Sequence, residues 1–371
     1  MKIRQPIVTI HGAIGIAIGL LLTVISLTGS AIVFHQEVDR AINPSLMRVV
    51  PQGKLASLDQ MIAPVQAAYP NFPLQSIRFP QTPNGSYQVT IKAQDGENLD
   101  TFVNPYTAKI LGSRKWERSL MGFLYELHYK LALGQVGTAI VGATGLLFLL
   151  IVITGTMLWT GWRKLKSGFT VRTAAPLPLL SYDIHQVGGI LSSTFLLILA
   201  VTGAMLSYFV LLFGLNQSPP VAKVLPPAKQ PVALSELLRK ADAAMPDGKT
   251  TYVVFDEAQP EKITVSKQLP HELLRFALSS VELNQYSGKV LKVNRVVEPP
   301  PMFKFMIAIG TLHFGLFGGI YTRILYVFIG LIPSVLLITG LVNWKRRRWL
   351  MARRESASQL LADETQSNRL S

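Results

Sequence analysis

Four long apolar runs dominate the pattern of hydrophobic and polar positions along this chain of 371 residues. They cover Ile7–Phe34, Val136–Trp159, Val187–Leu215 and Ile324–Trp344. A helix needs about 20 apolar residues to cross a hydrocarbon core of ~30 Å, and each run has about that length. The pattern therefore predicts four transmembrane helices in contact with membrane lipid, rather than two or three soluble domains.

The first apolar run follows Lys2 and Arg4, as the core of a signal peptide would. It is much longer than the roughly 7–15 apolar residues of such a core. We therefore expect an uncleaved membrane anchor, and cleavage near Gly29-Ser30-Ala31 is the minor alternative.

The two long segments between apolar runs have mixed helix and strand patterns. Residues 57–69 and 233–244 have helical periodicity, and Tyr87-x-Val89-x-Ile91 alternates as a half-buried strand does. Asn-Pro-Tyr-Thr at 104–107 and Asn-Gln-Tyr-Ser-Gly at 284–288 have the residues of hairpin turns. Each segment is therefore predicted to be a small α+β domain. A proline-rich linker is expected at 219–227, and a disordered polar tail at 355–371.

Four histidines occupy matched positions, because two precede a Thr-Gly pair by 17 residues and two by 26. The groups are His11 with Thr28-Gly29, His185 with Thr202-Gly203, His128 with Thr154-Gly155 and His313 with Thr339-Gly340. This spacing indicates two copies of one unit, that is, parallel repeats related by a pseudo-two-fold axis along the membrane normal. The symmetry should bring His11 to His185, and His128 to His313.

The expected architecture is a four-span α-helical membrane bundle with an internal two-fold repeat and two outer α+β domains. The spans are expected at 1–35, 128–162, 184–215 and 313–345. The outer domains are expected at 36–127 and 216–312, a cytoplasmic loop at 163–183, and a basic segment with its tail at 346–371.

The net charge of +15 would suggest a nucleic-acid partner in a soluble protein. Most of the excess lies in the N-terminus and in residues 163–172 and 345–354, whereas the two outer segments are close to neutral. This distribution is the positive-inside asymmetry of a membrane protein. It places both termini and the 163–183 loop in the cytoplasm, and we expect no nucleic-acid partner.

The depth of the outer pair follows from the longer spacing. A straight helix of 26 residues measures ~39 Å, more than the ~30 Å core. We therefore expect His128 and His313 at the outer headgroup level, on short helices broken by glycines 134 and 137 in one copy and 315, 318 and 319 in the other. His11 and His185 should lie near the cytoplasmic boundary.

Three hypotheses compete for what the histidine pairs bind. Interfacial histidines without a ligand are the simplest, but ionisable groups at membrane helices are costly and usually functional. A zinc site needs three close protein ligands, and no H-E-x-x-H accompanies the pairs. Two non-covalent haem b groups fit better, because a haem accepts one imidazole on each face. The chain has no cysteine, which excludes iron–sulfur clusters and covalent haem attachment through C-x-x-C-H.

Several other residues are weaker candidates. Arg323 is a candidate partner of a haem propionate, or it snorkels to the outer surface. His35 has no counterpart in the second copy and is an alternative outer ligand, a substrate contact or an ordinary helix-end residue. Glu126 is a candidate acceptor for His128, although a solvated acid is simpler. His271 is expected to be exposed, and the four threonines to serve helix packing. Glycines 12, 15, 19, 188 and 189 leave room for a flat macrocycle, or for close helix packing.

As a set, these motifs resemble the PepSY-associated transmembrane helix family of bacteria over residues 5–350. The likeness rests on His11-x-x-x-Gly15, the Asn-Pro-Tyr-Thr hairpin, Leu127-His128, Leu312-His313 and the closing Trp-Lys-Arg-Arg. The resemblance implies PepSY-like periplasmic domains and an inner-membrane di-haem oxidoreductase that releases ferrous iron by reducing a ferric siderophore, as in the ferrioxamine reductase type. Longer relatives carry a C-terminal flavin or nicotinamide domain, and no such domain is expected in this chain.

Electrons are then expected to enter at the cytoplasmic pair, from quinol or a cytoplasmic reductase, and to leave at the outer pair. Two alternatives remain open. A siderophore permease would need a polar path at mid-membrane, where only scattered Ser and Thr occur. A haem-free scaffold or regulator acting through its outer domains would tolerate loss of every histidine.

Overall fold

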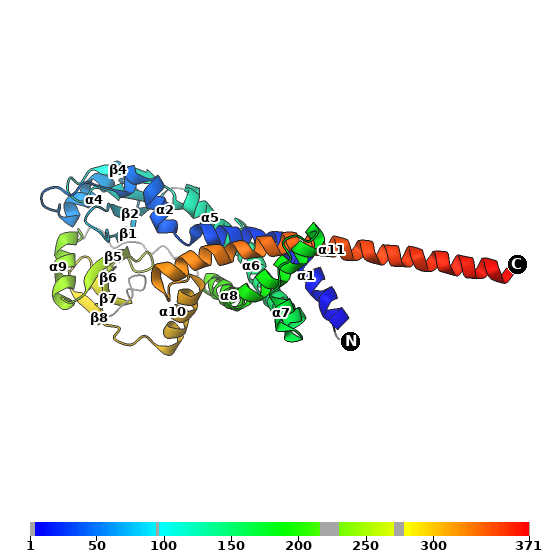
Figure 1. Cartoon of the computed structure of the whole chain (residues 1–371). Coiled ribbons are helices and arrows are strands. Elements are labelled where there is room, and N and C mark those ends of the chain that lie inside the picture. Colours follow the sequence, from blue (N-terminus) through cyan, green and yellow to red (C-terminus); the bar gives the residue numbers. More distant parts are fainter. Residues whose placement is uncertain (1–3, 94–95, 216–229, 271–277, 371) are drawn as a thin grey trace. The chain divides into compact units, whose positions relative to one another are not determined.

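A computed structural model of the chain describes residues 4–93, 96–215, 230–270 and 278–370 (Figure 1). The chain divides into two compact units. The helical unit comprises Met1–Val33, Leu124–Leu215 and Ile309–Ser371. The sheet unit comprises Phe34–Phe123 and Asn216–Ala308. The proline-rich linker at 219–227 and His271 lie outside the described residues.

Four long helices form the helical unit: α1 (Arg4–Ile32), α6 (Gly134–Leu158), α8 (Leu177–Leu215) and α11 (Gly319–Leu370). Each contains a stretch that is long and apolar enough to cross a membrane. The prediction of four spans is therefore confirmed, and the chain has the helices of a multi-pass membrane protein.

Small residues set the packing inside this bundle. Helix α1 contacts α6 and α11, and α8 contacts the same two helices, so the four form a closed ring. A Cβ on Gly145 would lie 3.2 Å from Ala204 Cβ, which shows how closely α6 approaches α8. On the other side, the Ser30 hydroxyl of α1 donates to the Val327 carbonyl of α11 at 3.0 Å. Such approaches between small residues are typical of membrane helices.

Two shorter helices precede the second and fourth spans: α5 (Leu120–Lys130) and α10 (Pro301–His313). Between α5 and α6 the backbone of Leu131, Ala132 and Gly134 has φ of 50°, 55° and 58°. Between α10 and α11, Gly315 and Gly319 have φ of 65° and 62°. Because an α-helix cannot continue through this left-handed region, the predicted breaks after both histidines are confirmed.

The C-terminal tail differs from expectation. We expected disorder over 355–371, but α11 continues to Leu370. Residues 341–370 contain no glycine or proline and are rich in Arg and Leu. These residue types sustain a helix that the membrane span has already nucleated, so polarity alone was a poor guide.

One antiparallel sheet of eight strands runs through the sheet unit in the order β4-β3-β2-β1-β5-β6-β7-β8. The strands are β1 (Leu74–Arg78), β2 (Tyr87–Lys92), β3 (Asn98–Val103), β4 (Ile110–Arg114), β5 (Lys249–Phe255), β6 (Lys262–Gln268), β7 (Ser279–Asn284) and β8 (Val290–Asn294). The prediction of two separate outer domains is therefore wrong in one respect, namely that both segments belong to one sheet. Strands β1 and β5 pair, with Ile77 opposite Val253, and join both segments in a single sheet.

A common core lies between one face of this sheet and the helices α4 (Leu58–Ala68) and α9 (Leu234–Ala244), both predicted from the sequence. Ser57 and Gln60 form a capping box at the start of α4. The first turn of α9 has no capping side chain of its own. Its backbone N–H groups at Leu234 and Ser235 donate to Asp59 of α4 at 2.7 and 3.1 Å, so one helix caps the other.

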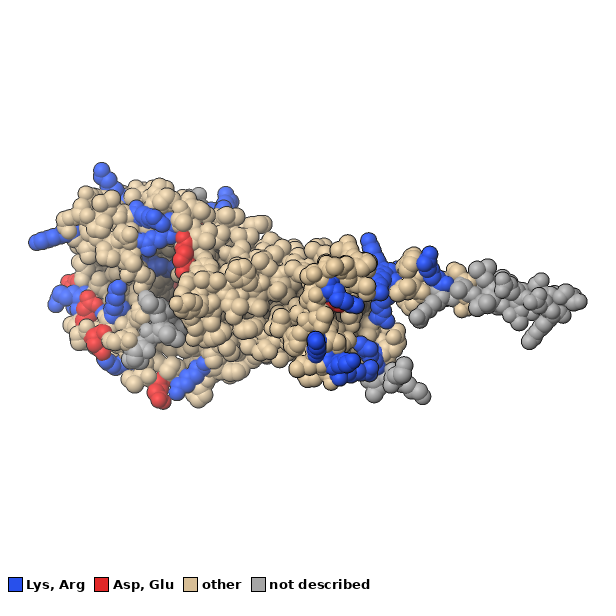
Figure 2. Space-filling model, in the orientation of Figure 1, with Lys and Arg blue, Asp and Glu red and all other residues tan. Residues whose placement is uncertain are grey.

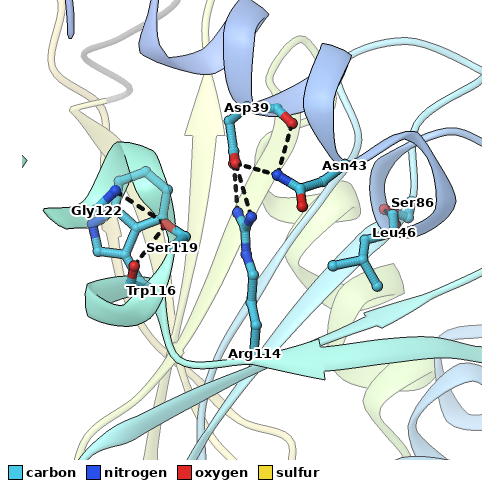
Figure 3. Close-up of polar contacts among 8 residues, drawn as sticks. All are labelled: Asp39, Asn43, Leu46, Ser86, Arg114, Trp116, Ser119 and Gly122. Carbon is cyan, nitrogen blue, oxygen red and sulfur yellow. Dashed lines mark hydrogen bonds and ion pairs between the residues drawn. The ribbon is translucent and has the colours of Figure 1, made fainter. Parts of the chain in front are cut away.

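The opposite face of the sheet contacts α2 (His35–Ile42) through an ion pair between the buried Asp39 and the partly buried Arg114 (Figure 3). Arg114 of β4 donates to both carboxylate oxygens of Asp39, at 2.8 and 2.5 Å, and Asn43 donates to Asp39 Oδ1 at 2.9 Å. Next along the chain, α3 (Pro44–Met47) is held by the Ser86 hydroxyl, which donates to the Leu46 carbonyl at 2.7 Å. The short helix η1 (Trp116–Arg118) then leads into α5.

Candidate functional site

The structure brings the four matched histidines together as two facing pairs in the helical unit. The ring centroids of His11 (α1) and His185 (α8) lie 6.2 Å apart, with perpendicular planes. Those of His128 (α5) and His313 (α10) also lie 6.2 Å apart, with planes tilted by 43°. These are the two pairings that the spacing predicted.

Each ring is held on its Nδ1 side by a helix of its own half of the chain. The hydroxyl oxygen of a threonine lies near Nδ1 in three cases: Thr154 at 3.0 Å from His11, Thr339 at 3.0 Å from His185 and Thr202 at 2.9 Å from His313. By spacing along the chain, the sequence matched His11 and His185 to threonines of their own helices, and His128 and His313 to threonines of the helix that follows. In the structure, each histidine instead lies beside a threonine of another helix at its own level.

The hydrogen bonds of these threonines fix the histidine tautomer. A hydroxyl has a single proton to donate. In Thr154 and Thr202 that proton goes to a backbone carbonyl one turn earlier, at 2.6 Å in each case. The same holds for Thr339, at 2.8 Å from the Val335 carbonyl. The hydroxyl oxygen is then available to accept from the imidazole, an arrangement that favours the proton on Nδ1 and leaves the Nε2 lone pair available to a metal.

His128 reaches the same tautomer by a different route. Its Nδ1 lies 2.8 Å from the Ile25 backbone carbonyl of α1, and a carbonyl only accepts. Thr28, the expected partner by analogy, lies farther away, with its hydroxyl oxygen 3.4 Å from Nδ1. The outer pair is therefore held by one carbonyl and one hydroxyl.

The glycine after each threonine lets an imidazole ring approach the helix. A Cβ added to Gly29 would lie 2.8 Å from His128 Cε1. At Gly155 and Gly203 the distances to His11 and His313 would be 3.1 Å, and at Gly340 the distance to His185 would be 3.4 Å. The Thr-Gly pairs are thus part of the site. The sequence pointed to them by spacing, but it did not show which histidine each one receives.

The separation of the rings suits two imidazoles that share one metal. A metal–imidazole bond of about 2 Å and roughly 1 Å from nitrogen to ring centroid place two such rings about 6 Å apart. Within the described part of the chain, no group of three or more His, Asp or Glu side chains converges to hold a bare ion. Each level therefore presents one pair of imidazoles as candidate metal ligands.

Space beside the first pair fits a flat group. A Cβ built on Gly12, Gly15 or Gly188 would meet nothing within 4 Å. Gly15 and Gly188 lie one turn along from His11 and His185, on the same side of their helices. Gly19 and Gly189, by contrast, face Leu337 and Leu336, so they serve helix packing. Gly15 and Gly188 thus leave open space beside this pair that a flat group could occupy, and the role of the glycines at a macrocycle stays a prediction.

The helical spacing between the two levels is shorter than the length of a straight helix of 26 residues. Along α1, His11 belongs to one level and Thr28, which lies beside His128, to the other. Seventeen residues of helix correspond to about 25 Å, which is less than the ~30 Å of a hydrocarbon core. The 26-residue spacing gave a larger value because some of those residues form the break between α5 and α6. The placement of His128 and His313 at the headgroup level stays a prediction.

An apolar layer separates the two levels. Its buried members come from all four long helices and lie between the inner and outer histidine positions: Ile18, Phe148, Val152, Leu196, Ala200 and Ile329. Water is excluded from this layer by close apolar packing.

The weaker candidates lie elsewhere. Arg323 donates to the Val33 carbonyl at 2.8 Å and thereby joins α11 to the end of α1. Glu126 does not orient His128, because it accepts from Lys130 at 3.1 Å and from Tyr129 at 3.0 Å. His35 begins α2 and belongs to the sheet unit. The roles predicted for Arg323 and His35 at a cofactor remain predictions.

Comparison with known proteins agrees with this arrangement of spans. Curated proteins gave no significant match. A family model described as the PepSY-associated TM region matches residues 8–347, which is most of the chain. With four apolar helices and paired histidines at two levels, the chain belongs to the PepSY-associated TM region family.

Proposed function

We propose that the chain is an oxidoreductase of the bacterial inner membrane that holds two haem b groups and reduces a ferric siderophore, releasing ferrous iron in the periplasm. One observation carries the proposal. Two histidine pairs, each with ring centroids 6.2 Å apart and Nδ1 occupied by a hydrogen bond, lie at two levels of one helical bundle. Facing imidazoles of this kind are the axial ligands of a b-type haem.

The residues have distinct roles in this proposal. His11 and His185 hold one haem, and His128 and His313 hold the other. A bound haem supplies one-electron chemistry at its iron, which the side chains of this chain do not. The protein orients the ligands, and its apolar layer keeps water away from the region between the two levels. Two levels about 25 Å apart suit electron transfer across a bilayer.

The substrate chemistry requires no acid–base residue. Hydroxamate and catecholate oxygens are hard donors that suit Fe(III). When one electron converts the iron to Fe(II), the chelate weakens and the metal is released. A ferric siderophore is therefore the substrate class that we assign to the outer level, with quinol or a cytoplasmic reductase as electron donor.

The orientation in the membrane follows from the charge distribution. On the face shown in Figure 2, Lys and Arg side chains of the helical unit gather at the end formed by α7 (Leu165–Gly168) and the basic turns of α11. The positive-inside rule makes this end cytoplasmic, so the sheet unit is periplasmic. The internal two-fold repeat is part of the same proposal, since it explains why each half contributes one ligand to each pair.

A visible spectrum of the full-length protein, purified in detergent from haem-replete cells, tests the proposal. We expect a Soret band, with sharp α and β bands after dithionite reduction, and two haems per chain. His11→Ala and His185→Ala should each remove one haem, and His128→Ala and His313→Ala the other. A colourless preparation would refute the haem assignment and favour a scaffold or regulator.

A second measurement addresses the substrate. The dithionite-reduced protein, freed of excess reductant, should be reoxidised by a ferric hydroxamate, and a ferrous-specific chelator should report Fe(II) in proportion. A protein that retains both haems but is not reoxidised by any ferric siderophore would carry electrons for another acceptor.

A further inference from the structure

We propose that three of the Thr-Gly threonines, Thr154, Thr202 and Thr339, are positioning residues that fix the tautomer of the axial histidines, whereas Thr28 is replaced in this role by the Ile25 carbonyl. The inference rests on the proposed haem sites for its effect on cofactor binding. The tautomer itself is a property of the protein alone and is tested separately.

The tautomer matters because only one imidazole nitrogen is available to a metal. A neutral histidine carries its proton on Nδ1 or on Nε2, and a proton on Nε2 blocks ligation at that atom. A threonine hydroxyl whose own proton is engaged by a carbonyl offers Nδ1 an acceptor and no donor. That arrangement occurs at Thr154, Thr202 and Thr339, so it selects the ligating form at three of the four histidines.

The threonines also link the two levels of the bundle. Helix α1 carries His11 for one level and Thr28 for the other, and α8 carries His185 and Thr202 in the same way. The positioning threonine of each histidine lies on a different helix of the same half. Substitution of Thr154 in α6 therefore changes the surroundings of His11 without changing α1, the helix that carries His11.

The difference at His128 separates positioning from packing. All four threonines donate to carbonyls of their own helices, so a role in helix packing would make them equivalent. Positioning makes them unequal. His128 has a carbonyl at 2.8 Å and its threonine lies at 3.4 Å. Loss of the Thr28 hydroxyl should therefore leave the His128 tautomer unchanged. The Ile151 and Leu336 carbonyls also face His11 and His185, so His313, which Thr202 contacts, depends most on its threonine.

The test uses the full-length protein with valine at each threonine in turn, because valine keeps the shape and removes the acceptor. Thr156→Val is the matched control, since the Thr156 hydroxyl donates to the Val152 carbonyl at 2.8 Å in the same turn as Thr154. Serine at each position should restore the wild-type result, because it restores the hydroxyl.

The first readout is the ¹⁵N chemical shift of the histidine ring nitrogens in haem-free protein from haem-deficient cells. Wild type should show protonated Nδ1 at all four histidines. T202V should convert His313 to a mixture, and T154V and T339V should change His11 and His185 less, because the Ile151 and Leu336 carbonyls remain. T28V and T156V should show no change. Predominant Nε2 protonation in wild type, or an equal response of T28V and T202V, would overturn the proposal.

The second readout is haem retention during dilution of the loaded protein. Loss of a residue that orients a metal ligand typically weakens metal binding by about 10-fold or more. We expect T202V to lose the haem of the His128–His313 pair about that much faster, and T154V and T339V to have a smaller effect on the haem of the other pair. If wild type binds no haem, the proposed function fails, whereas the ring-nitrogen shifts still decide the role of the threonines.

Discussion

Alanine substitutions at the four Thr-Gly glycines give a graded test of the site. The structure assigns each glycine a different clearance from its histidine: 2.8 Å at Gly29, 3.1 Å at Gly155 and Gly203, and 3.4 Å at Gly340. The four substitutions are chemically identical and occur in long helices. Any ranking among them therefore reports the contact with the imidazole ring.

Two opposing effects determine the sign of each change. Alanine gains about 1 kcal/mol over glycine inside a helix. Overpacking of a filled site costs about 1–3 kcal/mol when the neighbour cannot move. At Gly340 the new methyl makes an ordinary contact, so the helix term wins and the variant should be slightly stabilised. At Gly29 a methyl 2.8 Å from His128 must displace the ring, so the variant should lose about 1–2 kcal/mol.

The assay is thermal unfolding of the detergent-solubilised protein with and without haem, together with the haem-to-protein ratio. Stability should rank Gly340→Ala above the alanine variants of Gly155 and Gly203, with Gly29→Ala lowest. Gly29→Ala should also lose haem from the His128–His313 pair alone. Equal behaviour of Gly29→Ala and Gly340→Ala would refute the ring contact.

Gly15→Ala and Gly188→Ala are the controls for open space. Neither methyl meets an atom within 4 Å, so both variants should gain stability in haem-free protein from the helix term. In loaded protein the same methyls would occupy space beside the His11–His185 pair. A gain without haem combined with a loss of haem is expected; a gain in both states would place the cofactor elsewhere.

Three further predictions concern the ion pair, pH and spectroscopy. Asp39→Ala leaves the partly buried Arg114 guanidinium without its carboxylate and should destabilise the protein by about 1–3 kcal/mol in denaturant unfolding. Absence of a measurable effect would contradict a structural role of the pair. Burial raises the pKa of Tyr87 to about 12, whereas the pKa of an unfolded tyrosine is near 10. Between these values the folded state keeps a proton that the unfolded state loses, so the free energy of unfolding should fall as pH rises from about 10 to 12. Tyr87→Phe should remove this part of the decline. The two histidine pairs should give different low-spin ferric haem signals in electron paramagnetic resonance. We expect a strongly anisotropic signal from the perpendicular His11–His185 pair and a rhombic signal from the tilted His128–His313 pair. Identical signals would contradict the observed ring planes.

Much of the fold follows from local patterns. The apolar runs predicted the four spans, and the left-handed glycines at 134, 315 and 319 end or begin helices where the breaks were expected. Alternation in β2 predicted burial of Tyr87, Val89 and Ile91 on one face. The joining of both segments in one sheet was not predictable in this way. Alternation specifies which face of a strand is buried, but it does not specify which edges pair across 175 residues of chain.

The site was predictable in part for a similar reason. Equal spacing of the histidines predicted which rings meet, because symmetry alone relates them. It did not predict the Nδ1 contacts, since these depend on which helix faces lie together at a given level. The depth estimate used the length of a straight helix of 26 residues, whereas the chain breaks between α5 and α6, so the depth stays a prediction. Spacing along the chain measures distance only where the chain is continuous helix.

The chemistry of the donor set is what makes a metal cofactor a better explanation than interfacial packing. In each pair both Nδ1 protons are committed to acceptors on other helices, so each ring is left with a lone pair on Nε2. Two lone pairs at this ring separation repel one another and cannot hydrogen-bond to each other, because neither ring has a proton left to donate. A metal that accepts electron density from both sides would engage both lone pairs at once. A packing role for the histidines would not require the same tautomer at every ring. It also would not explain why this tautomer is favoured at both levels of the bundle.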